Sequence, residues 1–239
     1  MPGKPALKEH IEREGIQQVL EEIRRQGREA SSFFSMGKIS AAAWYGVNEA
    51  DILIMGSRDP LKVKVEITHS WGQPILHLLL EDSWIQVLSF KDRSLYVGSL
   101  SPRALSKFFQ VDIGPDIVWS VLRGYPTIRE HKYLSPERDR VVLLDPRGVE
   151  VERIIFYPET LTPKWVSYRD NKLDVSFRGF RKEGGIFYAE EVVIRDMKKK
   201  LVIRNQKMVF NREMPREVFR MRIPPGFETR SLEAPTNNK

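Results

Sequence analysis

The feature that most constrains the fold is a two-residue alternation of apolar and charged side chains at residues 61–67. The apolar members are Leu61, Val63, Val65 and Ile67, and the charged members are Lys62, Lys64 and Glu66. Successive side chains of a β-strand point to opposite faces of its sheet. The segment is therefore predicted to be a strand with one face buried and the other in water.

Similar short segments recur along most of the chain. Before residue 100, strands are predicted at 33–41, 51–56, 61–67, 75–80, 84–90 and 94–97. After residue 140, they are predicted at 141–144, 151–157, 164–169, 173–178, 187–195, 200–211 and 218–223. Short polar turns join them, which is typical of an antiparallel meander. We therefore expect a mainly β fold of about 11–12 strands.

Three helices are predicted beside these strands. Residues 7–30 show helical spacing of apolar side chains, which predicts one amphipathic helix. Ser101 and Gly114 each precede a proline and open two short apolar helices. A long sheet has to curl, and helices on one face cover its apolar side. The expected α+β architecture is an incomplete barrel with a helical lid: a lead-in at 1–6, a single domain at 7–228 and a flexible tail at 229–239.

Composition excludes several classes of protein. The 239 residues include no cysteine and four histidines, which rules out disulfides, cysteine-based zinc sites, iron–sulfur clusters and thiol nucleophiles. No apolar run approaches the ~20 residues that cross a bilayer, and the first residues lack the apolar stretch of a signal peptide. The net charge of +7 favours acidic partners such as nucleic acid or anionic lipid.

No pattern of catalytic residues stands out. His69 and His77 flank a predicted turn near Glu66, but no further ligand follows at a metal-binding spacing. The acidic pairs at 81–82 and 190–191 lie on strands, where adjacent side chains point to opposite faces and cannot flank one bond. The sequence also contains neither a nucleophile elbow nor a Walker loop. We expect no enzyme, no metal and no cofactor.

Two turns are candidates for surface contacts. Lys198, Lys199 and Lys200 occupy a predicted hairpin apex, where lysines are typical of a solvated turn that protects strand edges. Their functional alternative is contact with anionic phospholipid, which we place ahead of nucleic acid. Trp71 lies at another hairpin tip, where it either folds back onto the rim of the core, the preferred interpretation, or points outward to a membrane or partner.

The order of several short motifs resembles a known family. They are Trp71-Gly72-Gln73-Pro74-Ile75-Leu76, Tyr96-Val97-Gly98, Val121-Leu122-Arg123-Gly124, Asp145-Pro146-Arg147-Gly148 and the ending Phe219-Arg220-Met221-Arg222-Ile223-Pro224-Pro225-Gly226-Phe227. With the amphipathic first helix, this order is similar to that of the LolA/LolB-like lipoprotein carriers and receptors, over about residues 7–228.

The resemblance implies a half-barrel whose helices plug an apolar cavity that holds acyl chains. It also implies a non-enzymatic role in lipoprotein localisation, in the periplasm or at the periplasmic face of the outer membrane of a Gram-negative bacterium. The implied partners are lipid or lipoprotein acyl chains, the membrane surface and a carrier protein, with the chain a monomer. The receptor branch carries a lipidated N-terminal cysteine, which this chain would have lost by trimming, and an exposed apolar loop residue, for which Trp71 is the counterpart.

The candidate ligand site follows from the alternating strands and the two interposed helices. Its cavity and lid residues are Val63, Val65, Ile67, Leu76, Leu78, Leu105, Phe108, Ile117 and Leu122. Periodicity does not separate an open cavity from one filled by these side chains. Two alternatives therefore remain open: a basic module that binds nucleic acid or an anionic surface, and an envelope sensor or structural protein with a filled interior.

Overall fold

The computed structural model describes residues 13–44, 47–109, 111–137, 140–169, 172–197 and 199–232. Its first half contains α1 (Arg13–Glu29), β1 (Ser32–Trp44), β2 (Val47–Ser57), β3 (Lys62–Thr68), β4 (Pro74–Glu81), β5 (Trp84–Ser89) and β6 (Ser94–Ser99). Two short helices follow, α2 (Pro102–Phe109) and α3 (Pro115–Leu122). The second half contains β7 (Tyr133–Glu137), β8 (Arg140–Leu144), β9 (Glu150–Phe156), β10 (Pro163–Tyr168), β11 (Leu173–Glu183), β12 (Ile186–Arg195), β13 (Lys200–Phe210), the 3₁₀ turn η1 (Arg216–Phe219) and β14 (Glu228–Ser231).

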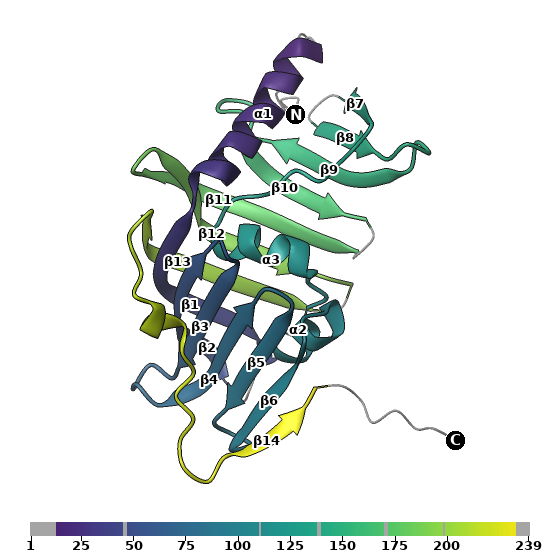
Figure 1. The fold of residues 1–239 in the computed structure, drawn as a ribbon. Coiled ribbons are helices and arrows are strands. Elements are labelled where there is room, and N and C mark those ends of the chain that lie inside the picture. Colours follow the sequence, from purple (N-terminus) through teal and green to yellow (C-terminus); the bar gives the residue numbers. More distant parts are fainter. Residues whose placement is uncertain are drawn as a thin grey trace, which may run out of the picture.

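The strands form one large curved sheet that does not close into a barrel (Figure 1). Across it the described strands follow the order β14-β6-β5-β4-β3-β2-β1-β13-β12-β11-β10-β9-β8-β7. Neighbours are antiparallel except β14 and β6, which are parallel. The predicted fold class is confirmed. Each strand predicted before residue 211 lies on an observed strand, and α2 and α3 begin directly after Ser101 and Gly114, as expected.

The first helix crosses the upper half of the sheet in the view of Figure 1. Residues 7–12 of its predicted span lie outside the described residues. Its buried side chains Ile16, Leu20 and Ile23 join the main apolar cluster of the protein. No helix in the described part of the chain has the length and apolar content needed to cross a membrane.

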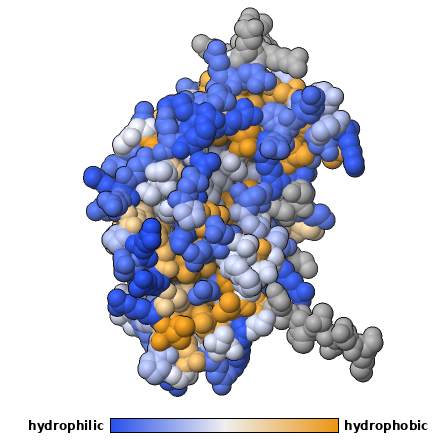
Figure 2. Space-filling view, viewed as in Figure 1, coloured by the Kyte–Doolittle hydropathy of each residue, from blue (hydrophilic) through white to orange (hydrophobic). Residues whose placement is uncertain are grey.

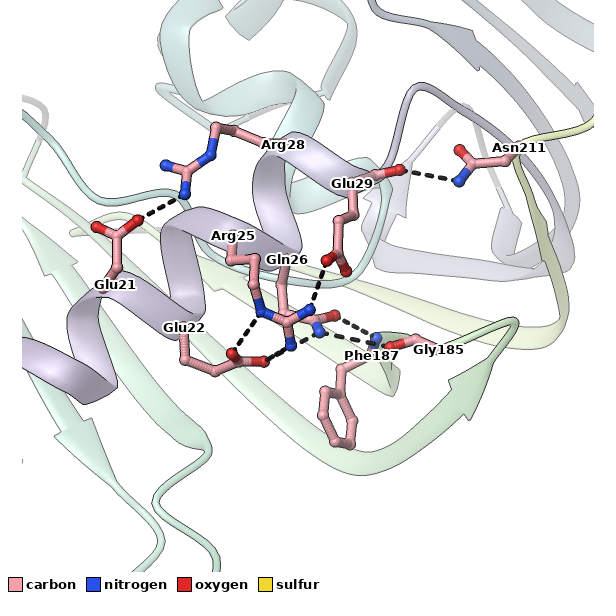
Figure 3. A network of polar contacts seen from close by, with 9 residues as sticks. All are labelled: Glu21, Glu22, Arg25, Gln26, Arg28, Glu29, Gly185, Phe187 and Asn211. Carbon is pink, nitrogen blue, oxygen red and sulfur yellow. Dashed lines mark hydrogen bonds and ion pairs between the residues drawn. The ribbon is translucent and has the colours of Figure 1, made fainter.

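A buried glutamine fixes α1 to the β11–β12 turn. Gln26 is fully buried, accepts a 2.8 Å hydrogen bond from the Phe187 N–H and donates to the Gly185 carbonyl at 3.4 Å. Figure 3 shows this side chain reaching from α1 toward the turn, while Arg25 lies between Glu22 and Glu29 on the helix surface. The position of α1 over the sheet is thus set by polar contacts as well as by its apolar side.

The C-terminal segment differs from the prediction. The predicted strand at 218–223 is wrong, because residues 216–219 form η1 and the segment crosses the convex face of the sheet. Phe219 packs there against Met55 and Leu79, in a second apolar cluster separate from the main one. Phe219 and Met221 of the predicted alternation therefore contact the outside of the sheet, whereas Ile223 is exposed. Figure 2 shows an apolar area over the first-half strands in the lower part of the view.

Two edge strands were not predicted. β14 pairs with β6 and Leu232 is buried, so the predicted flexible tail is wrong for residues 229–232; residues 233–239 lie outside the described residues, as do 1–6. β7 lies within the polar stretch 131–140 and pairs with β8 at the other edge. It contains Pro136, a residue that edge strands tolerate and central strands do not. Polar, short edge strands have little periodic signal in a sequence.

Candidate ligand-binding interior

The nine residues predicted to bind a ligand are all buried in the main apolar cluster of the protein. Val63, Val65 and Ile67 of β3 lie directly opposite Leu80, Leu78 and Leu76 of β4, so these side chains share the concave face of the sheet. Leu105 and Phe108 of α2 and Ile117 and Leu122 of α3 belong to the same apolar cluster. All nine are at most 5% exposed.

This arrangement is a covered apolar interior. Between the helices and the strands, the described side chains of the nine positions carry no polar atom that would fix the orientation of a bound molecule. Such a surface suits alkyl chains, at roughly 0.8 kcal/mol for each methylene moved out of water. Because the residues are covered, a ligand can reach them only if α2 and α3 move.

Each of the two short helices makes a polar contact with a segment outside itself. The Ser101 hydroxyl caps α2 by accepting the Ala104 N–H at 3.2 Å, and Lys107 donates to the Leu232 carbonyl at 3.2 Å. The end of α3 is tied to β12, since the Ala189 N–H donates to the Gly124 carbonyl at 2.7 Å. The bond from Lys107 to Leu232 must break or stretch when α2 moves away, and the bond between Ala189 and Gly124 when the end of α3 does.

The end of α3 also holds a buried cation. Arg123 is 1% exposed, and its Nη1 and Nη2 atoms have no hydrogen-bond partner. Its Cζ atom lies 5.0 Å from the centroid of the Tyr125 ring. Burial lowers the pKa of Arg123 to about 10, which leaves the guanidinium charged at neutral pH. One turn earlier, the buried Nε1 of Trp119 also lacks a partner.

A buried carboxyl group lies at the other end of α3. Glu152 of β9 is fully buried, and burial raises its pKa to about 8. Its Oε2 accepts the Arg129 N–H at 2.8 Å, while Oε1 has no partner. Tyr168, directly opposite on β10, is also fully buried, and its ring lies 5.0 Å from the Arg129 guanidinium, which pairs with Asp116 of α3 at 2.6 Å.

Sequence reasoning missed both buried ionisable groups. Glu152 occupies the same strand phase as Ile154 and Phe156, which are buried, so the two-residue period was a usable signal. The sequence signal for burial of Arg123 was weaker. A cation at the C-terminal end of a helix is usually explained by its interaction with the helix dipole, which does not require burial. In the described part of the chain, no group of three or more His, Asp or Glu side chains is arranged to hold a metal.

The sequence and the fold were compared with known families, curated proteins and solved structures. No model of a known family matches the sequence, and no curated protein matches it. Among solved structures, the chain is similar to a LolA superfamily protein from Nitrosomonas europaea, with a TM-score of 0.54 and 15% identity over 86% of this chain and 97% of that one. The chain has a LolA-like fold.

Two further structures agree. A DUF1329 family protein from Desulfovibrio piger aligns with a TM-score of 0.60 and 12% identity, over 86% of this chain and 97% of that one. A putative outer membrane lipoprotein-sorting protein domain from Vibrio parahaemolyticus aligns with a TM-score of 0.55 and 8% identity. The alignment covers 84% of this chain and 94% of that one. At such identities the likeness concerns the fold alone.

Within this LolA-like fold, Trp71 points outward. The preferred interpretation, that it folds back onto the core, is wrong, because the side chain is 72% exposed. Its ring stacks on His69 with centroids 4.3 Å apart, and its Nε1 donates to the Gln73 side chain at 3.4 Å. The contacts with His69 and Gln73 of the same turn therefore hold the tryptophan ring in its exposed position.

The predicted basic turn lies between β12 and β13 of the LolA-like fold. Lys199 and Lys200 are exposed there, and Lys198 lies outside the described residues. Ala41 pairs with Leu201, and Ser40 pairs with Glu49. Asp51 pairs with Thr68. These registers place the basic turn and the Trp71 turn at the same end of their strands.

Proposed function

We propose that this protein binds lipid or lipoprotein acyl chains and passes them on without catalysing a reaction. The observation that carries the proposal is the burial of nine apolar side chains from β3, β4, α2 and α3 within one apolar cluster. The LolA-like fold supports it. The chain acts as a single domain over residues 7–228, extended by β14 at its C-terminal edge.

Binding requires displacement of α2, α3 or both. The helices leave the concave face, and the alkyl chain takes the place of their side chains against Val63, Val65 and Leu78. Each methylene that the ligand buries contributes roughly 0.8 kcal/mol, which offsets the apolar packing that the helices give up. Because the protein loses packing when it opens, its net affinity for lipid is moderate, and a moderate affinity permits release without ATP.

We place this activity in the periplasm or at the periplasmic face of the outer membrane. Trp71 inserts into the headgroup region of the membrane or meets a carrier protein, and Lys199 and Lys200, with Lys198, contact anionic headgroups. The common strand end of the two turns supports this assignment. The protein acts as a monomer, held at the membrane by these turns or by a lipidated cysteine upstream of residue 1.

A second candidate function is that of an envelope sensor or structural protein with a permanently filled interior. The near-complete burial of all nine residues favours it. In this case the helices never leave the sheet, and the protein acts through a protein partner at its surface.

One experiment separates the two. The purified protein is titrated with a fluorescent fatty-acyl probe, the probe is displaced with unlabelled oleate, and native mass spectrometry detects lipid carried from an envelope extract. Acyl-chain binding predicts saturable uptake, displacement and a co-purified lipid mass. No uptake and no bound lipid would overturn the proposal and leave the filled interior.

A further inference from the structure

The most unusual group in the interior is the Arg123 guanidinium at the end of α3. A buried charge is stable only when it is paired, because transfer from water costs several kcal/mol. Arg123 is 1% exposed and leaves two guanidinium nitrogens without an acceptor. Among the described residues, no Asp or Glu side chain hydrogen-bonds to these two nitrogens, whereas Tyr125 and Arg58 lie close enough to influence the pKa of Arg123.

The surroundings of Arg123 are rich in donors. Arg58, just beyond β2, adds a second positive charge and donates from Nη1 to the Gly27 carbonyl at 2.5 Å. Trp119, one helical turn before Arg123, has an unpartnered Nε1. Its ring packs edge-on against Phe33 with centroids 5.0 Å apart, and the absence of a side chain at Gly56 lets both rings approach β2.

The neighbouring buried polar groups show that this deficit is local. Ser35 donates to the Asn205 side chain at 2.8 Å, Asn205 donates to the Ala189 carbonyl at 2.9 Å, and the Ala189 N–H donates to the Gly124 carbonyl at 2.7 Å. This chain of hydrogen bonds is complete and ends at the residue next to Arg123. Near the end of α3, the buried polar groups of Ser35, Asn205 and Ala189 are therefore hydrogen-bonded. The donors of Arg123 and Trp119 have no acceptor.

Two free nitrogens on one planar guanidinium match the two oxygens of a carboxylate or phosphate. Leu122 and Ile117, on the same helix, belong to the apolar interior. Arg123 directly follows Leu122, so it lies next to the apolar interior and beside the unpartnered donor of Trp119.

We propose that Arg123 binds the anionic end, a carboxylate or a phosphate, of the lipid whose chain enters the apolar interior. This inference rests on the proposed function and narrows its cargo to anionic lipids. The diacylglyceryl end of a lipoprotein is uncharged, so its ester oxygens can accept hydrogen bonds but cannot neutralise the charge of Arg123. Trp119 donates a further hydrogen bond to the anion, and Arg58 adds long-range attraction.

Three ligands with the same oleoyl chain test the charge requirement: oleate, oleoyl lysophosphatidic acid and the neutral monoolein. Each displaces the fluorescent acyl probe from the wild-type protein, with concentrations kept below micelle formation. We expect the better of the two anionic ligands to bind at least about tenfold more tightly than monoolein, as is typical of hydrogen bonds to a charged group. The arm that binds more tightly identifies carboxylate or phosphate.

The variant Arg123→Met locates the effect, and Arg103→Met on the exposed side of α2 is its charge-matched control. Arg123→Met is expected to remove the preference for anions, leave monoolein binding within about twofold, and raise the thermal stability of the ligand-free protein because an unpaired buried charge is gone. Arg103→Met is expected to change none of these. If Arg123→Met does not fold, Arg123→Lys retains the charge but loses the planar fork, and its preference for anions is expected to fall.

The outcomes test acyl-chain binding and the role of Arg123 separately. Equal binding of monoolein and both anions leaves acyl-chain binding intact and overturns the role of Arg123. An anion preference that survives in Arg123→Met, or in Arg123→Lys where only that variant folds, also overturns it. Binding of none of the three ligands overturns the proposed function and this inference together.

Discussion

The concave face of β3 and β4 differs from the two ends of α3 in the kind of side chain that it buries. On the concave face, β3 and β4 present only apolar side chains such as Val65 and Leu78, all buried in one cluster. Around α3 the same sheet buries Arg123 at one end and Glu152 at the other, each with an atom that has no partner. The first region provides affinity for chains without selectivity, whereas the second contains groups whose charge can select a ligand or respond to pH.

The largest effect is expected in the apolar region. Leu78→Ala leaves a cavity in fully buried packing, and it is expected to lower the free energy of unfolding by about 2–5 kcal/mol in chemical denaturation. Leu53→Ala, on the half-buried convex face, is the control and is expected to cost less. Equal losses would mean that the concave face is no better packed than the convex one.

In the polar region, the expected effect depends on pH. The pKa of Glu152 is raised from 4.5 to about 8 by burial, so between these values the folded protein holds a proton that the unfolded chain has lost. Raising the pH through this window therefore favours unfolding, by about tenfold in the equilibrium constant for each pH unit. Stability contributed by the neutral carboxyl is complete below pH 4.5 and lost above pH 8.

Glu152→Gln is the matched variant, because it keeps an oxygen for the Arg129 N–H but cannot ionise. Denaturation curves at several pH values between 4.5 and about 8 are expected to show the wild type weakening relative to this variant as the pH rises. Parallel stability profiles of the two proteins would contradict burial of an ionisable Glu152.

A smaller effect is expected where α1 meets the β11–β12 turn. Gln26→Ala removes both hydrogen bonds to the turn and leaves the Phe187 N–H without an acceptor, which is expected to cost about 1–3 kcal/mol. Hydrogen exchange should show faster exchange at Phe187 and along α1, with β3 and β4 unaffected. Unchanged protection at Phe187 would show that the apolar side of α1 alone holds the helix.

The smallest effect on folding is expected at Trp71. Because its side chain is 72% exposed, Trp71→Glu is expected to change stability by no more than about 0.5 kcal/mol. Transfer of a fluorescent lipid from the protein to anionic vesicles is nevertheless expected to be lost, since a charged tip no longer enters the headgroup region. Val149→Glu, at another exposed apolar turn residue, serves as the control. Unchanged transfer would limit Trp71 to its stacking on His69.

Most of the sheet was predictable because its strands carry a period of two with one buried face, as at Val63, Val65 and Ile67. The same rule misled at residues 218–223, where Phe219 and Met221 contact the convex face without forming a strand. Strand β7 carries Pro136 at an exposed edge and had no such signal. The burial of the nine apolar positions was predictable because burial follows periodicity, whereas Arg123 was missed because a missing partner is a property of three-dimensional surroundings.

The central claim, that an acyl chain lies between the short helices and the concave face, is tested most directly by photo-cross-linking. A fatty acid with a diazirine near the end of its chain is bound and irradiated, and the labelled peptides are identified by mass spectrometry. We expect labels within β3, β4, α2 and α3, which unlabelled oleate suppresses. Labels confined to the convex face around Phe219, or labelling that oleate does not reduce, would contradict it.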